Sequence, residues 1–217
     1  GDFHAFLLTS SGVNTTPVPS PVNSFTTCNY YYNQWGAIKI SPNGQKLGVA
    51  NYNNNFNCWQ NGYGGFELWD FSNSTGSVTA GFQLGGLTTN SINAWGGWGV
   101  EFSPDGTKMY GTRINNYLYN TASVLQWNLC AGSPTAIAAS EQTIAALTNN
   151  TNNGHGSIQL APNGKIYIAH YYTLSNANAI SVINNPNGLG SACNYSFLAQ
   201  SVSPNNSTWS LPNFIGS

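Results

Sequence analysis

Residues 35–51 read WGAIKISPNGQKLGVAN, and this stretch decides the fold class. It predicts a strand, a tight turn at Pro42-Asn43-Gly44 and a second strand, because Pro presets φ, Asn closes a turn and Gly accepts a positive φ. The pattern recurs as WGVEFSPDGTKMYGTR at 98–113 and as HGSIQLAPNGKIYIAH at 155–170. Pro42, Pro104 and Pro162 are 62 and 58 residues apart, so the chain is predicted to be a repeat protein.

Each repeat carries four strand signals separated by turn residues. The expected strands are 36–41, 46–51, 65–71 and 77–84, then 98–103, 108–113, 122–128 and 140–146, then 156–161, 165–170, 178–183 and 196–202. A further strand is expected at 3–9. Residues 2–15 resemble residues 65–79, which indicates that the N-terminal segment is the end of an earlier repeat.

Four short antiparallel strands in each repeat predict an all-β fold, a β-propeller of four-stranded blades. The chain is treated as one domain, 1–217, with full blades at 36–84, 98–146 and 156–215 and a partial blade at 1–24. Propellers have about four to eight blades, so three and a part indicate a piece of a larger ring. The alternatives are that partner chains supply the remaining blades, or that the terminal segment completes a four-bladed ring. The alternative is a β-sandwich whose hairpins resemble one another by chance.

The composition is unusual in its charge. Asp, Glu, Lys and Arg make up only 5% of the residues and the net charge is −1, which excludes electrostatic binding of nucleic acid or anionic membranes. Solubility must then come from neutral polar groups, of which Asn alone supplies 32. This balance favours an extracellular location. No apolar run is long enough to span a membrane, and Gly1 without a signal peptide suggests a mature or cut piece.

The four cysteines favour disulfides over a metal site. No CxxC pair occurs, and the histidines are not beside the cysteines, so zinc is not supported. Loops on one face of the first blade predict a Cys28–Cys58 bond. Cys130 and Cys193 follow the third strand of adjacent blades and predict a second bond. Four free thiols are the alternative.

The best candidate for a ligand site is the rim around the central axis. Repeat alignment makes Trp35, Trp98 and His155 equivalent at the start of the first strand, and Asn51, Arg113 and His170 equivalent at the end of the second. Tryptophan faces stack on sugar rings, and Arg and Asn hydrogen-bond hydroxyls. Alternatively, the tryptophans pack between blades.

The rim also contains the pair His155 and His170, which are expected to be neighbours. A metal site would need a third ligand, and acidic residues are scarce, so a hydrogen-bonded structural pair is expected and no metal or other cofactor.

Residues 36–215 resemble a known protein family. The resemblance is to the closing repeats of large secreted Bacteroidetes proteins. It rests on the sequences GSIQLAPNGKIYIAH, ISVINNPNGLGSACNYS and LPNFI between 156 and 215, and on GVEFSPDGTKMYGTRINN at 99–116. These proteins carry an N-terminal β-propeller, PKD-like domains and a gliding-motility or type IX secretion C-terminal signal. The resemblance implies export, a cell-surface or extracellular location and an adhesive or binding role. It implies no catalytic residues.

Three functions follow from this reading. The first is a non-enzymatic propeller module that binds a partner protein or a glycan at its loop face, with further blades or domains of a longer chain as neighbours. The second is a carbohydrate-active lyase or hydrolase, for which His155, His170, Arg113 and Tyr171 are the candidates, since no pair of acids has glycosidase spacing. The third is a structural piece of a surface filament or secretion assembly.

Overall fold

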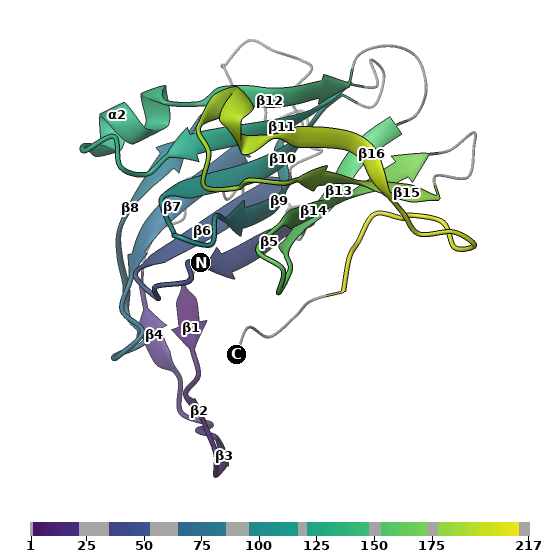
Figure 1. Cartoon of the computed structure of the whole chain (residues 1–217). Coiled ribbons are helices and arrows are strands. Elements are labelled where there is room, and N and C mark those ends of the chain that lie inside the picture. The colour runs from purple at the N-terminus through teal and green to yellow at the C-terminus, as the bar shows by residue number, and fades with distance from the viewer. Residues whose placement is uncertain are drawn as a thin grey trace.

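A computed structural model describes residues 2–21, 35–52, 65–85, 96–116, 121–147, 153–172 and 178–212. It is nearly all β, and its strand pairs are antiparallel (Figure 1). Twelve strands form three four-stranded units. The first unit contains β5 (Trp35–Ile40), β6 (Lys46–Tyr52), β7 (Gly65–Phe71) and β8 (Val78–Leu84); the second contains β9 (Gly96–Phe102), β10 (Lys108–Asn116), β11 (Thr121–Asn128) and β12 (Gln142–Leu147); the third contains β13 (Asn153–Leu160), β14 (Ile166–Tyr172), β15 (Ala179–Ile183) and β16 (Tyr195–Ser201).

The twelve strands predicted from the repeats are confirmed. Their ends shift by three residues at most, as where β13 begins at Asn153 and not at 156. Within each unit the strands follow one another in chain order, each paired with the next. A single residue pair, Tyr52 with Gly96, joins β6 to β9 and so connects the first two units into one sheet.

The same turn closes the first hairpin of every unit. Gly44, Gly106 and Gly164 have φ values of +68°, +68° and +75°, and each donates its N–H to the carbonyl three residues earlier at 2.8–2.9 Å. The left-handed φ is the reason that glycine occurs there. The Pro-Asn-Gly and Pro-Asp-Gly signals therefore predicted both the position and the chemistry of the turns.

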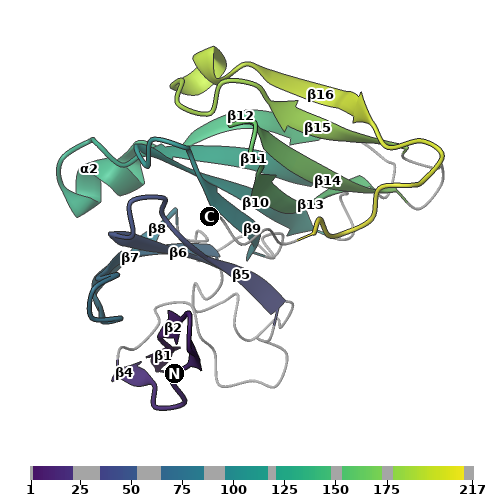
Figure 2. The same cartoon turned by 60° about the horizontal axis from the view of Figure 1, so that its bottom comes forward.

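The units stack face to face in chain order (Figure 2), and apolar side chains fill the space between them. Val100 and Phe102 of β9 are completely buried against the first unit, over Gly48 of β6. Ile158 of β13 packs in the same way on the second unit, beside Tyr110. The core is therefore divided between interfaces of successive units.

The N-terminal segment forms two short strand pairs and not the continuous strand expected at 3–9. β1 (Phe3–Ala5) pairs with β4 (Val18–Ser20), and β2 (Leu8–Thr9) pairs with β3 (Gly12–Val13) in a hairpin that projects from the body (Figure 1). Phe3 packs edge-on against Trp69 with ring centroids 5.5 Å apart, and Ser20 Oγ accepts the Val78 N–H at 2.9 Å. These contacts hold the segment against the outer strands of the first unit.

Two short helices were missed by the strand pattern. α2 (Pro134–Ala139) begins after Ser133, whose Oγ accepts the Ala136 N–H at 3.2 Å, and η1 (Gly190–Cys193) is a single 3-10 turn. Ile137 anchors α2 in the core. A capping serine followed by proline at the first helical position is a recognisable start signal, so α2 was predictable. The described residues contain no helix long and apolar enough to cross a membrane.

The predicted Cys130–Cys193 disulfide is wrong, because both residues are free thiols. Cys193 is completely buried in the interface of the second and third units, where burial raises the pKa of its thiol. Cys130 lies exposed in the turn after β11. The side chain of Cys193 thus points into the core and not toward its expected partner. Cys28 and Cys58 lie outside the described residues.

Alkylation of the folded protein should distinguish these thiols. Cys130 is expected to react with iodoacetamide at the rate of an exposed thiol, whereas Cys193 should react only after denaturation, because a buried neutral thiol is a poor nucleophile. Peptide mapping by mass spectrometry reads each site separately. If both residues are instead protected from alkylation until a reductant is added, the result would support the disulfide after all.

A methyl group at Gly111 tests the packing between the first two units. A Cβ there would lie 2.4 Å and 2.6 Å from ring atoms of Phe66, which is itself buried against Trp127. Gly111→Ala is expected to reduce the free energy of unfolding by about 1–3 kcal/mol, measured by urea denaturation. Gly48→Ala is the control, since its nearest contacts are side-chain ends at 3.0–3.2 Å, and it should cost less.

Candidate functional site

The backbone brings the six predicted rim residues to one end of the inner strand pairs. Trp35 is opposite Tyr52, Asn51 is opposite Gly36, and His155 is opposite His170. The strands β5, β9 and β13, which carry Trp35, Trp98 and His155, are neighbours. The side chain of Trp35 lies outside the described part of the structure, and Asn51 is half-buried.

Arg113 does not face the rim. It lies on the same side of β10 as Met109 and Gly111, because side chains alternate along a strand, and that side faces the first unit. Its guanidinium donates to both carboxylate oxygens of Glu141 at 3.3 Å and to the Gly85 carbonyl at 3.2 Å, above the Phe66 ring. The expected ligand contact is thus replaced by a bridge between the first two units.

His155 and His170 are neighbours, as predicted, with ring centroids 4.9 Å apart. The expected hydrogen bond between them is wrong: the rings meet edge-to-face, and neither ring nitrogen of His155 has a hydrogen-bond partner among the described residues. Both are completely buried, on the side of β14 that faces the second unit. His170 Nε2 shares a hydrogen bond of 2.7 Å with Ser181 Oγ, which also accepts the Tyr195 hydroxyl and the Leu198 N–H at 3.0 Å. The pair therefore belongs to the core and not to a surface that a glycan could reach.

Burial keeps both imidazoles neutral. It lowers the pKa of His155 to about 3, with a further contribution from His170, and lowers the pKa of His170 to about 4. Within the described residues no three His, Cys, Asp or Glu side chains are grouped as metal ligands. The chemical consequence of this buried pair is that protonation of the two imidazoles at low pH should destabilise the fold.

Stability should fall as the pH drops below about 6.5. The unfolded chain protonates both rings there, but the folded chain does so only near pH 4 and pH 3, so the unfolded state binds more protons in this window. Each histidine should then contribute a slope of up to about 1.4 kcal/mol per pH unit. Denaturation of His155→Phe between pH 6.5 and 4 should show a shallower slope. His4→Asn is the control, since His4 is exposed, and an unchanged slope in His155→Phe would contradict the assignment.

The rim itself is aromatic. Trp98 packs edge-on against Tyr52 at 5.3 Å and lies against Trp209 at 4.9 Å with an angle of 37° between the rings. Both tryptophans are half-buried. Trp98 is the extra residue of a β-bulge, because Gly97 pairs with Arg113 and Gly99 with Thr112. The predicted equivalence of Trp98 with His155 and Trp35 is therefore wrong, because Gly97 is the residue opposite Arg113, as His155 is opposite His170 and Gly36 is opposite Asn51.

Trp209 was missed by the sequence analysis because it follows the last strand and has no repeat partner. The segment after β16 returns to the innermost strand of the third unit, where the Trp209 carbonyl accepts the Ser157 N–H at 2.8 Å. The Leu211 N–H donates to Ser157 Oγ at 2.6 Å. Gly154 and Gly156 leave room for the indole and its backbone, since a Cβ at Gly156 would lie 2.3 Å from the Trp209 carbonyl oxygen.

A polar ladder connects the inner strands of all three units. Lys39, Glu101 and Gln159 each occupy the position three residues before the turn proline. Lys39 Nζ donates to Gln159 Oε1 at 2.8 Å and lies 3.5 Å from Glu101 Oε2, which also accepts the Leu160 N–H at 2.8 Å. Glu101 and Gln159 are buried. The ladder satisfies these groups internally and is structural.

Charged side chains elsewhere are also occupied by contacts within the fold. Lys46 pairs with Asp70, and Glu67 accepts the indole N–H of Trp69 at 2.8 Å in a buried site. Asp105 accepts the Ser103 hydroxyl and the Thr107 N–H in its turn. The described rim therefore presents aromatic rings and neutral polar groups, which suits stacking and hydrogen bonding to a neutral ligand.

Comparison with known proteins finds no matching family model and no matching curated protein. Among solved structures, the periplasmic gluconolactonase of Pseudomonas aeruginosa is similar, with 14% identity, a TM-score of 0.51, and coverage of 95% of this chain and 52% of that one. The extracellular domain of a hybrid two-component system from B. thetaiotaomicron has 16% identity, a TM-score of 0.47, and coverage of 96% and 22%. A protein from Lactobacillus plantarum has 12% identity, a TM-score of 0.44, and coverage of 83% and 46%.

The chain spans about half or less of the length of these three proteins. At this identity the similarity to the gluconolactonase concerns the fold alone. Together with the stacked antiparallel units, it gives the chain a propeller-like fold.

Proposed function

We propose that this chain is a non-enzymatic module of a larger β-propeller, located outside the cell or on its surface, which binds a glycan or a partner protein at its loop face. The three four-stranded units are full blades of that ring, and the N-terminal segment is part of another. The contact of Trp98 with Trp209 carries the proposal, since it places two half-buried indoles at the rim.

Ligand binding at this rim is supported by the lack of charge in the neighbouring sequence. Residues 53–64 and 86–95, which follow β6 and β8 in the sequence, are rich in Asn and contain no charged residue. Amide and hydroxyl groups beside a tryptophan face match a sugar, which has an apolar face and a hydroxylated edge. This favours a neutral glycan over a charged ligand.

The enzyme hypothesis has less support. Of its four candidates, His155 and His170 are completely buried and Arg113 is held by Glu141, while the side chain of Tyr171 lies outside the described residues. An acid–base reaction needs a titratable group within reach of the substrate. The contacts of these groups with the fold therefore support a binding role.

The extracellular location rests on composition and resemblance. Only 5% of the residues are charged, so the solubility of the chain depends on neutral polar groups. The sequence of the last repeats resembles that of secreted Bacteroidetes proteins. Export through a type IX secretion system, and a role in adhesion or gliding motility, are the parts of this proposal that follow from the resemblance.

A glycan array tests the rim. The unmodified chain is expected to bind a neutral oligosaccharide, and Trp98→Ala is expected to weaken binding about tenfold or more, because one stacked aromatic contributes on the order of 1–3 kcal/mol. The affinity for the glycan found on the array is then measured by calorimetry for both proteins.

Phe197→Ala is the matched control, since Phe197 is a 49% exposed aromatic residue on the outermost strand β16, where its ring packs edge-on at 5.4 Å against the buried His170. It should leave binding unchanged. Equal affinity of the unmodified chain and Trp98→Ala, with both folded, would remove the rim as the site.

A further inference from the structure

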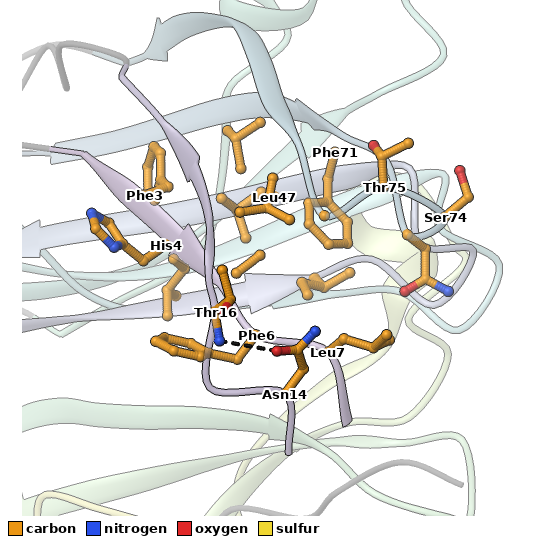
Figure 3. Close-up of a pocket in the computed structure, with 17 residues that line it drawn as sticks. Phe3, His4, Phe6, Leu7, Asn14, Thr16, Leu47, Phe71, Ser74 and Thr75 are labelled. Carbon is orange, nitrogen blue, oxygen red and sulfur yellow. Dashed lines mark hydrogen bonds between the residues drawn. The ribbon is translucent and has the colours of Figure 1, made fainter. Parts of the chain in front are cut away.

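An apolar groove of about 420 Å³ separates the N-terminal segment from the first unit. Figure 3 shows side chains of the segment, including Phe3, Phe6 and Leu7, opposite Leu47 and Phe71 of the first unit. Nine large hydrophobic residues are exposed in the described structure, and seven of them belong to this segment or to β5. These seven are Phe6, Leu7, Leu8, Val13, Val18, Ile38 and Ile40.

Comparison of the repeats shows what should cover the face of β5 that carries Ile38 and Ile40. Ile38 and Ile40 stand four and two residues before the turn proline, as do Val100 and Phe102 in the second unit. Val100 and Phe102 are both 0% exposed because they pack on the preceding unit, whereas Ile38 and Ile40 are 54% and 49% exposed. The first unit thus presents the side chains of an interface whose other half is incomplete.

The N-terminal segment packs on the outer strands of the first unit and so supplies the outer part of the incomplete interface. Phe3 meets Trp69 edge-on at 5.5 Å, just as Phe66 of β7 meets Trp127 of the next unit at 4.9 Å. β1 therefore occupies the place of a third strand and β4 that of a fourth. In the first unit the third strand, β7, pairs with β6 on its inner side, but β1 pairs with β4 alone among the described strands.

We propose that this groove is the docking site for a β-hairpin, which supplies the two inner strands of the blade to which β1 and β4 belong. The hairpin lies on polypeptide continuous with the N-terminal segment. One of its strands pairs with the inner edge of β1, and its apolar face covers Ile38 and Ile40. The docked hairpin continues the stacking that already joins the three units.

The chemistry of the groove matches such a hairpin. An unpaired strand edge offers backbone hydrogen bonds, and adjacent apolar side chains offer burial, which are the two contributions of β-strand addition. The groove has one titratable lining residue, His4, and five neutral polar ones, of which Asn14, Ser74 and Thr75 are hydrogen-bonded within their own turns. The rest of the lining is apolar, which suits the apolar face of a hairpin that brings its own backbone pairing.

The chain itself provides a suitable hairpin. The face of β9 and β10 that carries Tyr110 and Thr112 receives Ile158 of the third unit, an aliphatic residue at the same repeat position as Ile38. A second copy of residues 96–122, placed directly before Asp2, would lead into β1 as β9 and β10 lead into β11.

This extended chain tests the proposal. It is expected to raise the Tm by about 5 °C, since about 2–4 °C accompanies each kcal/mol in a chain of this size. Amide exchange at Phe3 and Ala5 should slow about tenfold or more, because an edge strand becomes an inner one. Adding Ile38→Asp and Ile40→Asp to the extended chain should abolish both gains. The same pair of changes should have little effect in the original chain, where both residues are already half-exposed.

Leu189→Asp is the matched control, because Leu189 is 46% exposed but lies before η1, outside the groove, and it should leave the gain intact. If the extended chain does not fold, a peptide of residues 96–122 added to the original chain is tested for the same protection of Phe3 and Ala5.

Four results would overturn the proposal. The first is an unchanged Tm and unchanged exchange in the folded extended chain, and the second is a gain that survives Ile38→Asp and Ile40→Asp. The third is dimerisation of the original chain in sedimentation, lost on Ile38→Asp and Ile40→Asp, which would make a second copy the occupant. A peptide that gives no protection, where the extended chain fails to fold, would also overturn it.

Discussion

Burial of each unit's apolar side chains against the preceding unit is the constraint on which the rest of this structure depends. A four-stranded sheet has two faces, and in the second unit both are apolar and both are covered, by Phe66 on one side and Ile158 on the other. Because the two larger buried clusters lie between successive units, most of the core of each unit is shared with its neighbour. Stability must therefore be shared along the row of units, as in other repeat proteins.

The few charged groups are arranged to serve this stacking. Lys39, Glu101 and Gln159 join the inner strands, and Arg113 with Glu141 joins the first two units farther out. A half-buried ion pair at an interface contributes more when its remaining hydrogen bonds are satisfied, and the Gly85 carbonyl accepts one such bond from Arg113. Charges committed to such bridges are not available to a ligand, and this leaves the rim to aromatic and neutral polar side chains.

The repeat made the strands and turns predictable, because each signal occurred three times with the same physical cause. Prolines at a fixed offset and glycines with positive φ located every inner hairpin. Repeat alignment correctly paired His155 with His170. It could not reveal that these rings are buried, since the direction of a side chain at a strand end depends on the pleat and on the neighbouring unit.

The errors arose where one local feature broke the repeat. A one-residue bulge moved Trp98 out of register with Trp35, and alternation along β10 turned Arg113 toward the first unit. Cys193 was assigned to a loop, but its η1 turn directs the thiol into an interface. Trp209 has no counterpart in the other repeats, so nothing in the periodic pattern connected it with Trp98.

The rim and the groove differ in ways that assign them different kinds of partner. At the rim, Trp98 and Trp209 are half-buried rings supported by backbone hydrogen bonds at Ser157, so the surface is formed before a ligand arrives. In the groove, Ile38 and Ile40 are about half-exposed near β1, which pairs with β4 alone among the described strands. A preformed aromatic surface suits reversible recognition, whereas an open apolar face with a free strand edge is an incomplete core. We therefore propose ligand recognition for the rim and completion of the stacked fold for the groove.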